Sequence, residues 1–162
     1  MGAAAVAVIV LVLLAVAQRR PRWARPALIA SRLIYGVWIV AGLAYFPAKA
    51  GWALRPVECE WTFDAALAVH SFSNVPHIIL FAMFFPLTYA QLRGIRHALA
   101  WSAVACITMG FLVEIAQGIS GVHHCRMRDL IPDATGILIG LLLVLAGRGA
   151  IAAWRSRKPV PS

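Results

Sequence analysis

The sequence predicts an all-α integral membrane protein, built as a bundle of about five transmembrane helices. Two observations predict this fold class. Hydrophobic residues make up 62% of the 162 residues, whereas soluble domains are roughly 45–50% apolar. Apolar runs also recur along nearly the whole chain, separated by connections that carry the charges. We therefore expect a single membrane domain over residues 1–162, without a separate soluble domain.

Five apolar segments are the candidate spans, near residues 3–17, 27–46, 75–92, 98–116 and 130–147. A membrane helix needs roughly 20 mostly apolar residues. The first segment is the shortest of the five candidates. A signal peptide carries positive charge before its apolar run, but here the charge follows it, in Arg19, Arg20 and Arg22. We interpret this first segment as an uncleaved anchor.

The positive charges predict how the spans are oriented. Most of the 15 Lys and Arg residues fall in the first and third connections and the C-terminal tail, and the alternate side holds Lys49, Arg55, Arg126 and Arg128. The positive-inside rule then places the N-terminus outside and the C-terminus in the cytoplasm. We expect a multi-pass protein of a bacterial-type inner (plasma) membrane.

The net charge of +9 bears on the partners of the chain. Clustered beside apolar runs, the arginines suit the lipid bilayer and its anionic lipid headgroups. Nucleic acid is not expected as a partner, because no basic face is interleaved with aromatic residues. Other membrane subunits are a further candidate partner, because the chain has little mass outside its spans.

Polar residues from three separate segments are predicted to meet near the outer membrane boundary. These candidate site residues are Asn74, His77, Glu114, Gln117, Arg126, Arg128, Asp129 and Asp133. A charge within an apolar run costs several kcal/mol unless it is paired or wetted, so Glu114 and Asp133 are candidates for a functional site. The alternatives are a structural ion pair for the acids, a helix N-cap for Asp129 and interfacial anchors for the arginines.

Glycine, cysteine and histidine residues give three further expectations. Gly136 and Gly140 lie four apart on the last span and permit close helix contact. Cys59 and Cys125 fall in outer connections and can form a disulfide in an oxidising compartment. The segment 123–125, "HHC", offers metal-ligand types near Glu114, but its spacing matches no strong zinc signature, so neither a metal nor a cofactor is expected.

Three pieces of this region resemble VanZ-like membrane proteins. They are "NVPHIILF" at the start of one span, "EIAQ" at the end of the next and "RMRDLIPDATG" leading into the last, together covering about residues 74–140. The resemblance implies that His77, Glu114, Gln117, Asp129 and Gly136 are the family's polar and glycine positions. Its arginine matches Arg126 or Arg128.

The resemblance has two departures and one functional implication. Asn74 stands where the family commonly has Asp, and Asp133 stands where it commonly has Asn. The family is named for a protein associated with teicoplanin resistance, which implies an envelope context. Three hypotheses follow: a non-enzymatic protein that binds a lipid or glycopeptide headgroup, an accessory subunit of a larger membrane complex, and a membrane enzyme acting on a lipid-linked or cell-wall substrate.

Overall fold

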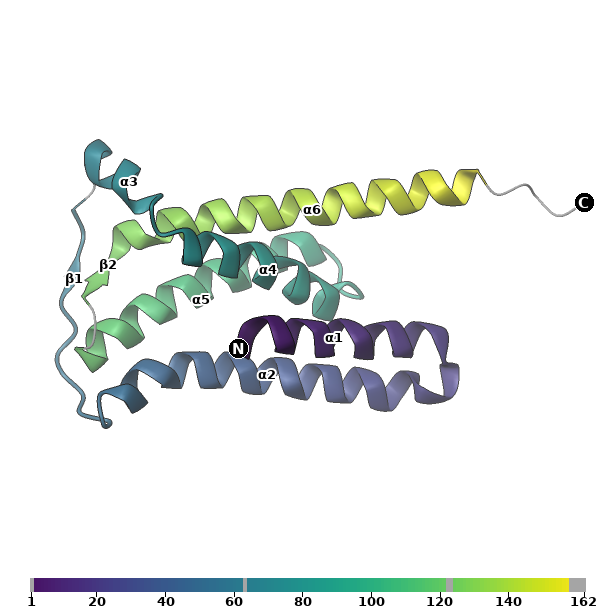
Figure 1. The fold of residues 1–162 in the computed structure, drawn as a ribbon, viewed down its shortest axis with the longest axis horizontal. Helices are drawn as coiled ribbons and strands as arrows, with labels where there is room; N and C mark the ends of the chain where they lie inside the picture. Colours follow the sequence, from purple (N-terminus) through teal and green to yellow (C-terminus); the bar gives the residue numbers. More distant parts are fainter. Residues whose placement is uncertain (1, 63, 122–123, 158–162) are drawn as a thin grey trace, which may run out of the picture.

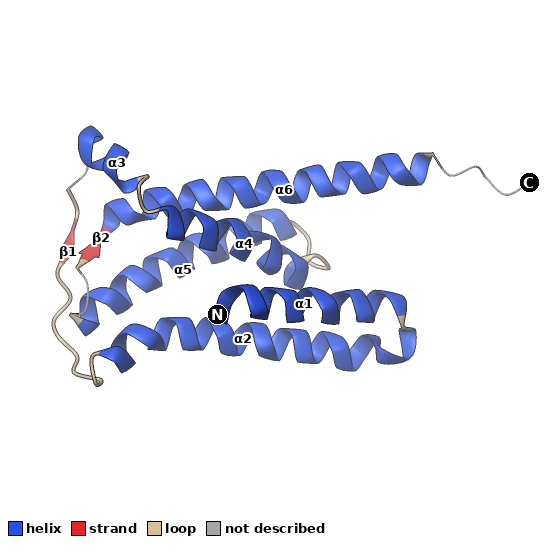
Figure 2. Cartoon of the chain, viewed as in Figure 1, coloured by secondary structure: helices blue, strands red, loops and turns tan. Residues whose placement is uncertain are grey.

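A computed structural model describes residues 2–62, 64–121 and 124–157. Its elements follow in this order (Figure 1): α1 (Gly2–Arg19), a 3-10 turn (Pro21–Trp23), α2 (Ala24–Lys49), β1 (Cys59–Glu60), α3 (Ala65–Ser71), α4 (Val75–Leu92), α5 (Ala98–Ser120), β2 (Cys125–Arg126), a second 3-10 turn (Met127–Asp129) and α6 (Leu130–Ser156). Figure 2 shows how completely helices dominate the chain, which confirms the all-α fold class. The single-domain assignment over residues 1–162 stays a prediction.

Within the described residues, four helical segments are long and apolar enough to cross a membrane: Pro21–Lys49, Val75–Leu92, Ala98–Ser120 and Met127–Ser156. Each contains one of the predicted spans. The remaining predicted span lies in α1, a shorter apolar helix. The chain is therefore a multi-pass membrane protein, while a fifth crossing by α1 and the orientation of the bundle stay predictions.

Helices α4 and α6 pack closely against each other. A Cβ atom at Gly136 would collide with the carbonyl oxygen of Ile78, and one at Gly140 would lie 2.7 Å from the Cβ of Phe85. Both glycines thus let the backbone of α6 approach α4, which is how small residues promote helix contact in membranes. This packing fixes the relative position of the first turns of α4 and α6.

The helices α1 and α2 form a hairpin that lies along α4 and α5 (Figure 1). Side chains of α2 join the aromatic core of the bundle, where Tyr35 stacks on Phe84 with ring centroids 5.9 Å apart. Tyr35 also shares a 2.6 Å hydrogen bond with Thr88. The hairpin is thereby tied to α4 in the middle of the predicted membrane region.

A disulfide and a short strand pair close the end of the bundle where α5 ends and α6 begins (Figure 1). The disulfide joins Cys59 to Cys125, which settles the pairing that the sequence left open. The strands β1 and β2 are parallel, with Cys59 opposite Cys125 and Glu60 opposite Arg126. These strands were not predictable from the sequence, because each has two residues and no alternating pattern.

Candidate functional site

All eight candidate site residues lie at the end of the bundle closed by the disulfide, which we call the polar end. Asn74 and His77 belong to the start of α4, and Glu114 and Gln117 belong to the last turns of α5. The remaining four come from β2, the following 3-10 turn and the first turn of α6. The antiparallel course of these helices brings residues from distant parts of the chain to one depth.

The first polar contact at this end joins α4 to α6. Nδ1 of His77 lies 2.8 Å from Oδ1 of Asp133 in a hydrogen-bonded pair. The Asp133 side chain is only 2% exposed, whereas that of His77 is 21% exposed. The second oxygen, Oδ2, has no hydrogen-bond partner among the described residues and lies over Gly110 of α5, where a Cβ would come within 2.7 Å of it.

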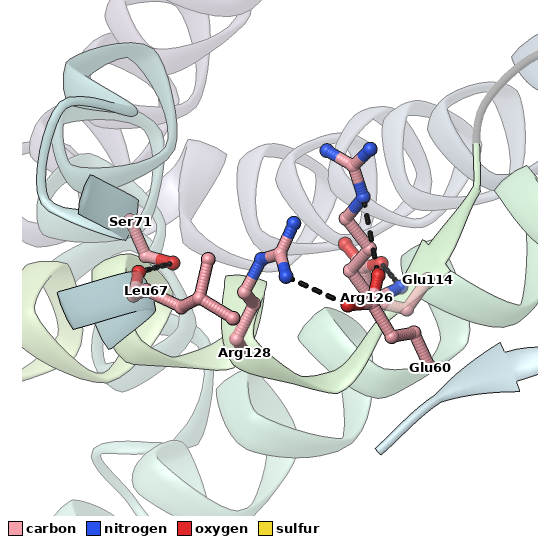
Figure 3. A network of polar contacts seen from close by, with 6 residues as sticks. All are labelled: Glu60, Leu67, Ser71, Glu114, Arg126 and Arg128. Carbon is pink, nitrogen blue, oxygen red and sulfur yellow. Dashed lines mark hydrogen bonds and ion pairs between the residues drawn. The ribbon is translucent and has the colours of Figure 1, made fainter. Parts of the chain in front are cut away.

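The second contact joins α5 to β2. Oε2 of Glu114 accepts a hydrogen bond from the backbone N–H of Arg126 at 2.9 Å (Figure 3). Glu114 is fully buried, and in the described part of the chain its Oε1 has no hydrogen-bond partner. Because this carboxylate holds the backbone at Arg126, it determines where the arginine side chain begins.

The third contact is the ion pairing of Glu60, which differs between Arg126 and Arg128, the two arginines that the resemblance could not distinguish (Figure 3). Nη1 of Arg128 lies 2.8 Å from Oε1 of Glu60, and the Arg128 side chain is 13% exposed. Arg126 reaches the same carboxylate only through Nε, at 3.7 Å, and its side chain is 42% exposed. Arg128 is therefore engaged in an internal ion pair, whereas the terminal nitrogens of Arg126 point away from Glu60.

A pocket of about 570 Å³, the polar pocket, opens among these groups. Its lining includes Arg55, Asn74, His77, Gln117, Arg126 and Asp129. Asp129 occupies the N-cap position of α6, as one alternative predicted, but its side chain makes no capping hydrogen bond and lines the polar pocket. Glu114 and Asp133 are not part of the lining. They hydrogen bond to two residues that are, Arg126 and His77 respectively.

Sequence reasoning missed several residues of this site. Arg55 and Glu58 line the polar pocket, and Glu60 pairs with the arginines beside it. His124, which the sequence offered only as a possible metal ligand, also lines the pocket. The backbone N–H of Arg55 donates to the carbonyl of Ile119 at 2.9 Å, which fixes the connection against the end of α5. The one available signal was the cysteine pair, since a bond between Cys59 and Cys125 necessarily brings Glu58 and Glu60 to β2.

The metal alternative falls partly outside the described residues, because His123 of the "HHC" segment is not among them. Among the residues that are described, no group of three or more His, Cys, Asp or Glu side chains is arranged to hold a metal ion.

Comparison with known proteins identifies the family. A family model described as VanZ/LLP1 matches residues 2–148. The chain belongs to the VanZ/LLP1 family. The match extends on both sides of residues 74–140, so the α1–α2 hairpin and the disulfide-bearing connection are part of the VanZ/LLP1 region. No curated protein and no solved structure matches the chain.

Proposed function

We propose that this protein binds the anionic headgroup of an envelope molecule, bearing phosphate or carboxylate, in the polar pocket. The observation that carries the proposal is that Arg55 and Arg126 line the pocket with guanidinium groups whose terminal nitrogens are hydrogen bonded to no carboxylate of the described residues. Guanidinium groups bind phosphate and carboxylate through paired N–H donors, so two of them facing one pocket suit an anionic ligand.

The surroundings of the two arginines support the same function. Glu60, the acid that pairs with the Arg126 side chain, is already engaged by Arg128 at 2.8 Å, so it competes only weakly for the Arg126 guanidinium group at 3.7 Å. Asn74 and Gln117 add amide groups to the lining, and these can donate to or accept from the rest of a headgroup. The predicted orientation puts this pocket at the outer face, where lipid and glycopeptide headgroups are found.

The test is a calorimetric titration of hexyl phosphate into the purified full-length protein in a non-ionic detergent. Arg55→Gln and Arg126→Gln should each weaken binding by at least about tenfold, because each removes a charge-assisted hydrogen-bonding group. Arg148→Gln is the matched control, since Arg148 is exposed near the far end of α6. Equal affinities in the four proteins would contradict the proposal.

A second candidate function, hydrolysis of the bound headgroup, is favoured by the His77–Asp133 pair. Nδ1 of His77 is engaged with Asp133, which leaves Nε2 for a water molecule at a phosphoester in the pocket. In this scheme Nε2 accepts a proton as the water attacks phosphorus, and the proton then passes to the departing alkoxide as the P–O bond breaks. Release of inorganic phosphate from hexyl phosphate, lost in His77→Gln, is the expected result. A protein that binds hexyl phosphate without releasing phosphate would leave binding as the function.

A further inference from the structure

A second pocket, of about 180 Å³, lies between α2, α4 and α5 and is apolar over most of its lining. Trp38 and Gly42 contribute to it from α2, Phe81 and Phe84 from α4, and Met109 from α5. We call it the apolar pocket. Water is stable in a protein cavity only where it finds about two to four polar partners, and aromatic and aliphatic walls of this kind offer few.

The apolar pocket adjoins the polar pocket. Three residues line both of them: Phe46 near the end of α2, His77 in the first turn of α4 and Gln117 near the end of α5. From these residues the apolar lining continues to Trp38, Phe84 and Met109. Seven or eight helical residues separate the members of each pair, so the lining extends about 12 Å along the bundle from the shared residues.

We propose that the apolar pocket holds the hydrocarbon chain of the same ligand whose anionic headgroup occupies the polar pocket. This inference rests on the proposed function and narrows its ligand to an anionic lipid, since a water-soluble anion has nothing to place between α2, α4 and α5. The apolar pocket begins at His77 and Gln117, where the headgroup site ends. It then runs into the predicted membrane region, where a lipid chain already resides.

Gly42 allows a direct test of this pocket. A Cβ atom added there would have its nearest neighbour at 3.9 Å, the Cε of Met109, which is ordinary van der Waals contact. Gly42→Leu should therefore fill the apolar pocket without displacing the backbone. Gly36→Leu is the matched control, because Gly36 lies on the same helix and a Cβ there would meet nothing within 4 Å.

The experiment compares inorganic phosphate with butyl, hexyl and octyl phosphate, titrated into the full-length protein in non-ionic detergent. In the wild-type protein and in Gly36→Leu, affinity should rise by up to about fourfold per added methylene, the transfer free energy of a CH₂ group expressed as a binding ratio. In Gly42→Leu the rise should be lost while the affinity for inorganic phosphate stays unchanged. Micelle partitioning acts equally on both variants, so it cancels in their comparison.

The two proposals fail in different ways. If all four phosphates bind equally well and Arg126→Gln weakens each of them, the chain site is overturned and headgroup binding stands. If affinity rises with chain length equally in Gly42→Leu and Gly36→Leu, the chain site is also overturned. If chain-length dependence is lost in Gly42→Leu but Arg126→Gln has no effect, the apolar pocket holds the chain and the anionic headgroup is overturned.

Discussion

His77, in the first turn of α4, is hydrogen bonded to Asp133, in the first turn of α6, with 2.8 Å between Nδ1 and Oδ1. One residue of the pair is buried and the other is partly exposed. Asp133 is buried at 2% exposure, while His77 is 21% exposed and lines both the polar and the apolar pocket. The sequence posed these roles as alternatives, and the geometry shows one pair that links two helices and also faces a pocket.

The energetic coupling of this pair is the first prediction. Because the two side chains share one hydrogen bond, a double-mutant cycle with His77→Ala and Asp133→Leu should give an interaction energy of about 0.5–3 kcal/mol in detergent unfolding. The control cycle combines His77→Ala with Asp64→Ala, whose carboxylate accepts a hydrogen bond from the backbone of α3, and should give about zero coupling. Zero coupling in both cycles would show that the contact does not stabilise the fold.

The burial of Glu114 gives the second prediction. Glu114→Leu removes the acceptor of the Arg126 backbone N–H and should cost about 1–3 kcal/mol, the penalty for an unsatisfied buried donor. Glu114→Gln keeps an oxygen at the same distance and should recover most of that loss. Hydrogen exchange at the Arg126 amide should be faster in Glu114→Leu than in Glu114→Gln. Identical exchange in the two variants would rule out this role for the carboxylate.

Close packing of α4 on α6 gives the third prediction. Gly136→Ala places a methyl group against the carbonyl of Ile78, where backbone must move, and overpacking of this kind costs about 1–3 kcal/mol or more. Gly147→Ala is the same change on the same helix with nothing within 4 Å. It should be neutral or stabilising by up to about 1 kcal/mol, because alanine favours helix. The midpoints of thermal unfolding of the two variants check this prediction. Equal midpoints would contradict the close packing at Gly136.

The disulfide gives the fourth prediction. Reduction of the Cys59–Cys125 bond, which joins residues 66 positions apart, should destabilise the protein by about 2–4 kcal/mol, because the bond restricts the conformational freedom of the unfolded chain. Cys59→Ser should reproduce the loss and abolish the response to reductant. Cys106→Ala should keep that response, since Cys106 is a free buried thiol. A melting temperature that does not change on reduction of the wild-type protein would oppose this expectation.

The sequence predicted the helices well and the site only in part. Hydropathy located α2, α4, α5 and α6, because each must present an apolar surface to lipid over its whole length. It also located His77, Glu114 and Asp133, because ionisable groups stand out within apolar runs. The family resemblance indicated His77 and Glu114 independently, whereas Asp133 is one of its two departures.

Residues of the long connection were not predictable in the same way. Arg55, Glu58 and Glu60 lie where no periodicity constrains the backbone, and their positions depend on a strand register of two residues and one disulfide. The difference between Arg126 and Arg128 has the same origin, since it rests on which guanidinium group Glu60 engages. Tertiary contacts of this kind leave no local sequence pattern.

Photo-crosslinking tests the central claim, an anionic headgroup held at Arg55 and Arg126, most directly. The probe is octyl phosphate with a diazirine on the carbon next to the phosphate ester, irradiated with the full-length protein and mapped by mass spectrometry. Label should fall on residues 52–58, 117–121 and 124–129 around the polar pocket, and it should decrease in Arg126→Gln but not in Arg148→Gln. Label spread over outward-facing residues such as Trp101 and Val104, which line a shallow apolar groove, and unchanged in Arg126→Gln, would contradict the claim.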